Sequence, residues 1–289
     1  MKPQPTEELT ELVLHVLAHV RLAGPGNIHD PRYVAWVREH ASAEHVEVLR
    51  QTAEPLAAAW RDQTPMMVHA WPELFETVEA LRATAGRTLA ELGPDDVAGP
   101  GILRELKRLD PAPVERLHAT LQAVASDGAP GHRERARLEL RHAERELRPW
   151  WEPAVAVLPS LEASRIELSH VLGARGRVYG ERIVVGAPVP WNALDPRVSV
   201  LLAMHEQLVR DAGPSSYADG EWAALTGLAD RMRDAPHALR RAHAQWLASL
   251  ELGPLLESIH AAGRIDATTR EVLERSPEHR AGRLAELGS

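Results

Sequence analysis

The sequence contains no cysteine among its 289 residues. This absence excludes disulfide bonds, a thiolate nucleophile and cysteine-ligated zinc, so a metal ion would need histidine or carboxylate ligands. The absence of cysteine is compatible with a location in the cytosol.

Aromatic residues are also few: the chain has one phenylalanine, three tyrosines and eight tryptophans. Most of the tryptophans fall on apolar stripes or at element ends, so core packing is their expected role.

Long hydrophobic runs and an excess of positive charge are absent as well. No stretch of about 18 apolar residues occurs, and the first residues are polar and acidic, unlike a signal peptide. The 33 basic residues are mixed with 41 acidic ones, which gives a net charge of -8. We therefore predict a cytoplasmic protein that neither spans a membrane nor binds nucleic acid. The expected partner is a protein or peptide, with a small molecule as the alternative.

Helical periodicity dominates residues 1–157. Thr6 is a suitable N-cap for a first helix, Pro31 fits the first position of a second, and Ser42 can cap a third. Apolar residues recur at helical spacing again over residues 71–109. We expect this half of the chain to form an all-helical domain.

Some histidines in this half have the spacing of metal ligands. Three pairs qualify: His15 with His19, Glu115 with His118, and Glu139 with His142. The first pair lies one helical turn apart and could share a metal ion, although partly buried histidines at a helix contact are the more common finding. The other two pairs have the Glu-x-x-His spacing of di-iron bundles. The third, however, lies in a charge-dense helix whose pattern is typical of a solvated face.

The pattern changes after Pro159, where strand signals appear. Residues 164–172 and 182–186 are rich in isoleucine and valine and are separated by a segment with three glycines, which predicts a small antiparallel hairpin or sheet edge. His170 lies in the first of these strands. Residues 158–289 are therefore predicted to be an α+β region with a helical tail. The predicted fold class is mainly α, with the helical N-terminal half packed on this C-terminal half.

The segment 195–212 carries the strongest helical pattern together with a chemically notable pair. Asp195 is a good N-cap, Pro196 fits the first helical position, and apolar residues follow at helical spacing. His205 falls within the apolar stripe. Glu206 lies about 100° further round the helix, at the edge of the stripe. This is the position from which a side chain on a buried helix reaches a cleft.

The order of these elements resembles the zincin metallopeptidases of the HExxH type, over residues 160–233. The shared features are two strands, a glycine-containing connection, a buried helix with His-Glu, and a following helix that opens with a glutamate. The resemblance implies zinc as cofactor, with His205 and Glu221 as ligands and Glu206 as the general base.

The chain departs from the zincin motif at one position. Val209 stands where the second histidine of the motif belongs, and valine cannot bind a metal ion. A complete ligand set then requires another residue, for which His170 and the His15 and His19 pair are candidates.

Three hypotheses for the function remain open at this point. The first is a zincin-like protein without peptidase activity that acts as a binding or partner subunit. The second is an active metal-dependent hydrolase with a rearranged ligand set. The third is a helical scaffold unrelated to zincins, in which His205 is a core histidine.

Overall fold

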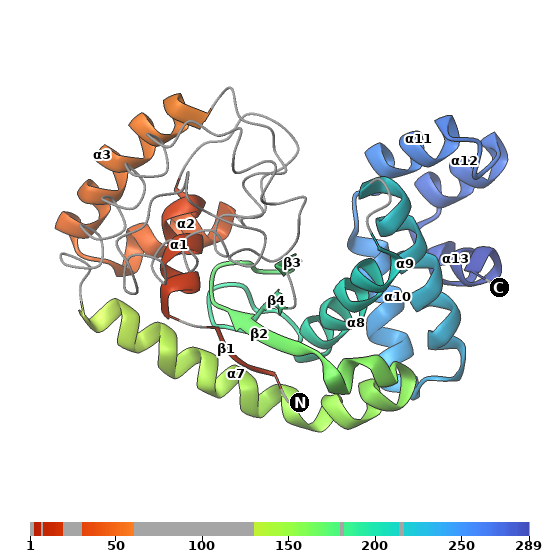
Figure 1. Cartoon of the computed structure of the whole chain (residues 1–289), viewed down its shortest axis with the longest axis horizontal. Helices are drawn as coiled ribbons and strands as arrows, with labels where there is room; N and C mark the ends of the chain where they lie inside the picture. The colour runs from red at the N-terminus through yellow and green to blue at the C-terminus, as the bar shows by residue number, and fades with distance from the viewer. Residues whose placement is uncertain are drawn as a thin grey trace, which may run out of the picture. The chain divides into compact units, whose positions relative to one another are not determined.

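The fold is mainly α-helical with one small sheet (Figure 1). A computed structural model of the chain describes residues 3–6, 8–19, 31–60, 130–179, 182–213 and 217–288. The predicted fold class, mainly α with a small β element, is confirmed. The helical periodicity over residues 71–109 and the pair Glu115 and His118 lie outside the described residues.

Two compact units make up the chain, and both combine distant segments. Unit 1 comprises Met1–Pro3, Arg145–Ile166 and Asp195–Ser289, and unit 2 comprises Gln4–Glu144 and Glu167–Leu194. Each unit therefore draws on both sides of residue 157, where the sequence suggested a boundary. A composition change marks where strands begin, but it does not reveal which segments pack together.

Of the first three helices of unit 2, the second and third begin where the sequence predicts, at Pro31 and directly after Ser42. The three helices are α1 (Glu8–Ala18), α2 (Pro31–His40) and α3 (Ala43–Trp60), and each contacts the other two. The Ser42 hydroxyl accepts a hydrogen bond of 3.2 Å from the His45 backbone N–H, so the predicted cap is present. Buried Val13, Leu14 and Val37 form part of the core between them.

The sheet is mixed, with the strand order β1-β2-β4-β3. Its strands are β1 (Gln4–Pro5), β2 (Arg165–Ser169), β3 (Gly176–Tyr179) and β4 (Arg182–Gly186). β1 runs parallel to β2, whereas β3 and β4 form an antiparallel hairpin.

The two predicted strands, β2 and β4, are neighbours in the sheet, but they do not form a hairpin with each other. The glycine-containing segment between them supplies β3, which is the true hairpin partner of β4. β1 was not predicted, because two residues carry no periodicity. β4 is buried along its whole length, as expected for a central strand.

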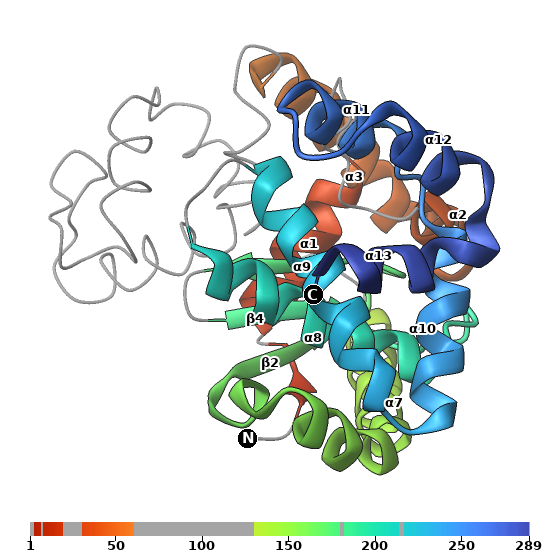
Figure 2. The same cartoon turned by 90° about the vertical axis from the view of Figure 1, so that its right-hand side faces the viewer.

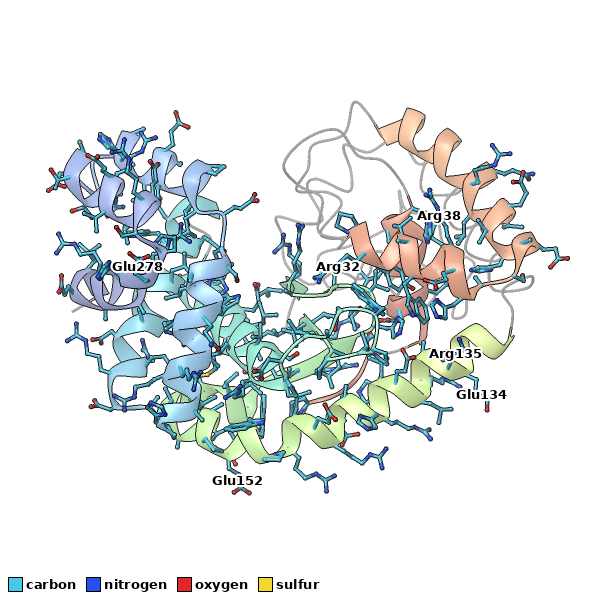
Figure 3. The ribbon with its side chains drawn as sticks, turned by 180° about the vertical axis from the view of Figure 1, so that it is seen from behind. Arg32, Arg38, Glu134, Arg135, Glu152 and Glu278 are labelled. Carbon is cyan, nitrogen blue, oxygen red and sulfur yellow. The ribbon has the colours of Figure 1, made fainter. Side chains whose placement is uncertain are left out.

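Helix α7 (Pro130–Val157) has the solvated face that its charge pattern predicts. Buried residues recur along it with spacings of four, three and four: Ala136, Leu140, Ala143 and Leu147. The charged residues between them are mostly exposed, and Figure 3 shows Glu134 and Glu152 projecting away from the helix. The apolar stripe is narrow because alanines occupy half of it.

The described part of unit 1 is otherwise helical. Its elements are η3 (Pro159–Ala163), α8 (Pro196–Ala212), α9 (Tyr217–Arg231), η4 (Met232–Asp234), α10 (His237–Ser249), α11 (Gly253–Ala261), α12 (Ala267–Arg275), η5 (Pro277–His279) and α13 (Arg280–Gly288). α8 contacts α9 and α10, and α13 contacts the same two helices (Figure 2). Within the described ranges, no helix has both the length and the apolar character needed to cross a membrane.

Candidate functional site

The predicted His-Glu pair lies at the centre of α8, which starts as its sequence indicates. The Asp195 carboxylate accepts a hydrogen bond of 2.9 Å from the Arg197 backbone N–H, and Pro196 occupies the first turn. All residues from 199 to 208 are buried. The ring of His205 is therefore held inside unit 1, with only 3% of its surface exposed.

Two carboxylates flank the imidazole ring of His205. Its Nδ1 lies 3.4 Å from Oε1 of Glu206, and its Nε2 lies 3.5 Å from Oε1 of Glu221 on α9. Glu206 is buried, whereas the side chain of Glu221 is 24% exposed. The fold thus brings three residues singled out from the sequence into one group. The distances are too long for strong hydrogen bonds, but they allow attraction between a protonated ring and the carboxylates.

Helix α10 adds two aromatic side chains to this group. The Trp246 ring meets the His205 ring edge-on, with 5.6 Å between centroids, and the His243 ring lies 6.0 Å from that of Trp246. Burial, together with the nearby charge of His205, lowers the pKa of His243 to about 4. His243 is therefore neutral at neutral pH. Both residues are buried, and it is the Trp246 ring that contacts His205.

The residues of this group do not fit the zinc ion that the resemblance implies. A catalytic zinc site needs three protein ligands, whereas His205 and Glu221 supply two and position 209 holds valine. In the part of the chain that the structure describes, no group of three or more His, Cys, Asp or Glu residues is arranged to hold a metal ion. We therefore derive no chemical step through zinc, and the role of Glu206 as general base stays a prediction.

His170, the other predicted ligand, belongs to unit 2 and has partners there. Its ring Nε2 forms an ion pair with Glu139 of α7. Its backbone N–H donates a hydrogen bond of 2.6 Å to the Glu11 carboxylate, and its carbonyl accepts one of 3.1 Å from the Trp191 indole. The side chain is fully buried. These contacts give His170 a structural role at the end of β2.

Two of the three histidine pairs of the N-terminal half lie within the described part of the chain. Glu139 contacts His170, whereas His142 on the next turn is exposed, so this Glu-x-x-His pair does not form one site. The rings of His15 and His19 lie 5.3 Å apart at an angle of 72°. His15 bonds to other residues instead.

A buried hydrogen-bonded chain runs from Tyr33 through His15 to His45. The Tyr33 hydroxyl lies 2.8 Å from His15 Nδ1, and His15 Nε2 lies 2.9 Å from His45 Nε2. Burial raises the pKa of Tyr33, and the charges of Glu11 and Glu139 raise it further. Tyr33 therefore keeps its proton and donates to His15, which sets the tautomer in which His15 donates to His45. Three helices, α1, α2 and α3, each supply one member of this chain.

Glu11 is the buried acid that sequence reasoning missed. Burial raises the pKa of its carboxyl group to about 7, although hydrogen bonds from Ser169 and from the His170 backbone act in the opposite direction. Glu11 and His15 are four residues apart on α1 and share one helical face, and His19 follows directly after the end of the helix. That spacing was the sequence signal that could have indicated Glu11. Its hydrogen-bond partners Ser169 and His170 come from a distant segment and could not be found in this way.

In comparisons with known proteins, no protein-family model, curated protein or solved structure matches the chain.

Proposed function

We propose that this chain binds an extended segment of a protein or peptide partner and does not hydrolyse it. The observation that carries this proposal is the position of β3 at one end of the sheet order β1-β2-β4-β3. Among the described residues β3 pairs with β4 alone. An open strand edge offers a row of main-chain donors and acceptors, to which an extended peptide can add as a further strand.

The register of the hairpin identifies the main-chain groups on this open edge. The Gly186 N–H donates a hydrogen bond of 2.8 Å to the Arg175 carbonyl, so these two residues form a hydrogen-bonded pair. Hydrogen-bonded and non-hydrogen-bonded pairs alternate along an antiparallel ladder. The main-chain N–H and C=O groups of Arg177 therefore point towards β4, whereas those of Gly176 and Val178 point away from β4.

The His205 group supports the absence of peptidase chemistry in this proposal. It provides two candidate ligands, His205 and Glu221, where a zinc peptidase uses three protein ligands and a bound water. The ring is also almost fully buried. Its neighbours are the carboxylates of Glu206 and Glu221 and the ring of Trp246, all supplied by the helices of unit 1.

The variant Val178→Pro tests the peptide-binding edge. Proline removes the outward N–H of residue 178 and leaves the ladder to β4 intact, because this N–H does not take part in it. A displayed library of random twelve-residue peptides is selected on the wild-type protein, and the enriched peptides are measured by fluorescence polarisation. We expect Val178→Pro to weaken their binding about tenfold or more. Val178→Thr keeps the N–H and is expected to bind as the wild type does.

Two outcomes would overturn the edge as a binding site. One is a selection that enriches no peptide on the wild-type protein. The other is binding that Val178→Pro leaves unchanged while circular dichroism shows an intact fold.

Metal content separates the binding protein from the metal-dependent hydrolase. After incubation with Zn²⁺ and removal of the excess, we expect no stoichiometric zinc in the wild-type protein and no cleavage of the selected peptides. Stoichiometric zinc that is lost in His205→Ala, together with cleavage, would instead support the hydrolase. The exposed His279, changed to Ala, is the matched control.

A further inference from the structure

The proposed peptide site has a cationic side chain lying along its open edge. Arg177 of β3 is half-buried, and its Nη1 donates a hydrogen bond of 2.7 Å to the carbonyl of Gly176. That carbonyl is one of the outward groups identified by the register. The guanidinium group therefore lies at the edge itself and covers one of the acceptors that a peptide would use.

No carboxylate of the described residues neutralises Arg177. Its guanidinium group donates to the carbonyl of the preceding residue, and its Nε makes no hydrogen bond with the described part of the chain. Acidic residues outnumber basic ones in the whole chain by 41 to 33. The nearby Arg182 on β4, by contrast, lies 3.7 Å from the Glu167 carboxylate.

We infer that Arg177 selects an acidic residue in the bound peptide, so that the ligand is an extended segment carrying aspartate or glutamate. This inference rests on the proposed function. A carboxylate forms a stronger, bidentate contact with a guanidinium group than a neutral carbonyl does. When the Arg177 guanidinium group binds the peptide carboxylate, it releases the Gly176 carbonyl. This carbonyl can then accept a main-chain hydrogen bond from the peptide. One exchange thus provides both the side-chain contact and the main-chain contact.

In the absence of a ligand, the same contact protects the edge. Open strand edges promote pairing between chains, and a charged side chain on the edge opposes it. The Arg177 side chain occupies the acceptor of Gly176 until a carboxylate competes for it. A peptide without an acidic residue would leave this contact in place and bind more weakly.

The test uses the peptides selected on the full-length wild-type chain. We expect them to share an aspartate or glutamate, and we expect replacement of that residue by asparagine or glutamine to weaken binding about 5- to 20-fold. Arg177→Gln should weaken binding of the acidic peptide by a similar factor and should not weaken binding of the amide peptide further. Arg177→Glu should shift the selection towards peptides with lysine or arginine.

Arg38 on α2 provides the matched control. It is exposed and labelled in Figure 3, and Arg38→Glu changes the net charge by the same amount as Arg177→Glu. We expect this control to leave the peptide preference unchanged. An equal effect of both reversals would assign the preference to the net charge of the protein and overturn the inference.

Failure of the inference and failure of the proposed function give different results. Peptides that bind in a Val178→Pro-sensitive manner, but without a shared acid and without an effect of Arg177→Gln, would overturn the role of Arg177 and leave the edge as the binding site. Binding that Val178→Pro does not affect would overturn both.

Discussion

His243 and Glu11 show how single buried residues respond to the protein interior. Both have their pKa shifted mainly by burial, which penalises the charged form. For histidine the charged form is the protonated one, so its pKa falls. For glutamate it is the deprotonated one, so its pKa rises. The two residues therefore change the stability of the protein in opposite directions with pH.

The change His243→Gln should reduce the acid sensitivity of the protein. Above pH 6.5 the ring is neutral in both states, and the folded protein has its full stability. As the pH falls towards the folded pKa of about 4, only the unfolded chain takes up the proton. The free energy of unfolding should then fall by about 3 kcal/mol in the wild type. The free energy of unfolding, measured by urea unfolding at several pH values between 4 and 6.5, should depend less steeply on pH in the variant than in the wild type.

A control variant separates this effect from a general loss of stability. His279 is exposed, so His279→Gln should keep the pH slope of the wild type. Equal slopes for the wild type and His243→Gln would contradict the prediction, whatever the absolute stability of the variant.

The change Glu11→Gln should act with the opposite sign. The folded pKa is raised from 4.5 to about 7, so the contribution of Glu11 is fully present below pH 4.5 and is lost as the pH rises through 7. Glutamine retains an oxygen that can accept the bond from the His170 N–H and never ionises. At pH 8 we expect Glu11→Gln to be more stable than the wild type by about 1 to 3 kcal/mol, measured by urea unfolding.

Glu134 on α7 supplies the corresponding control, because its side chain is exposed. Glu134→Gln should leave the dependence of stability on pH unchanged between pH 4.5 and 8. The prediction for Glu11 would be wrong if Glu11→Gln were less stable than the wild type at pH 8.

At the scale of elements, Gly186 fixes the end of β4 against the preceding loop. A Cβ at this position would lie 1.6 Å from the carbonyl oxygen of Gly173. Because that neighbour is main chain, it cannot move aside without displacing the strand. We expect Gly186→Ala to lower the free energy of unfolding by about 3 kcal/mol or more. Gly253→Ala, where no atom lies within 4 Å of the added Cβ, should change it by less than about 1 kcal/mol. Equal midpoints in thermal unfolding would contradict the prediction.

Helix limits could be predicted from the sequence, whereas strand pairing could not. Asp195 and Ser42 cap their helices through hydrogen bonds to main-chain groups two or three residues away, so the signal lies within one short segment. The hairpin was assigned to β2 and β4 because β3 is only four residues long and lies in a segment with three glycines, which is typical of a connection. The pairing of β3 with β4 depends on a register that no single strand carries.

At the scale of the whole molecule, the sequence grouped residues that the fold assigns to different units. His170 belongs to unit 2 and contacts Glu139, whereas His205 belongs to unit 1 and contacts Glu206 and Glu221. The proposed ligand set for zinc drew on both. Each unit is assembled from separate segments of the chain, so closeness along the sequence is a poor guide to its membership.

The sequence by itself determined the fold class, the main helices with their caps, and the burial of His205 on α8. These properties follow from local hydrogen bonds and from the 3.6-residue period of apolar side chains, both of which act within one segment. Only the tertiary structure decided that Glu221 and Trp246 join His205, that Tyr33, His15 and His45 form one chain, and that β3 ends the sheet. These contacts join distant segments, and the period of one helix or strand does not specify which partner its buried face meets.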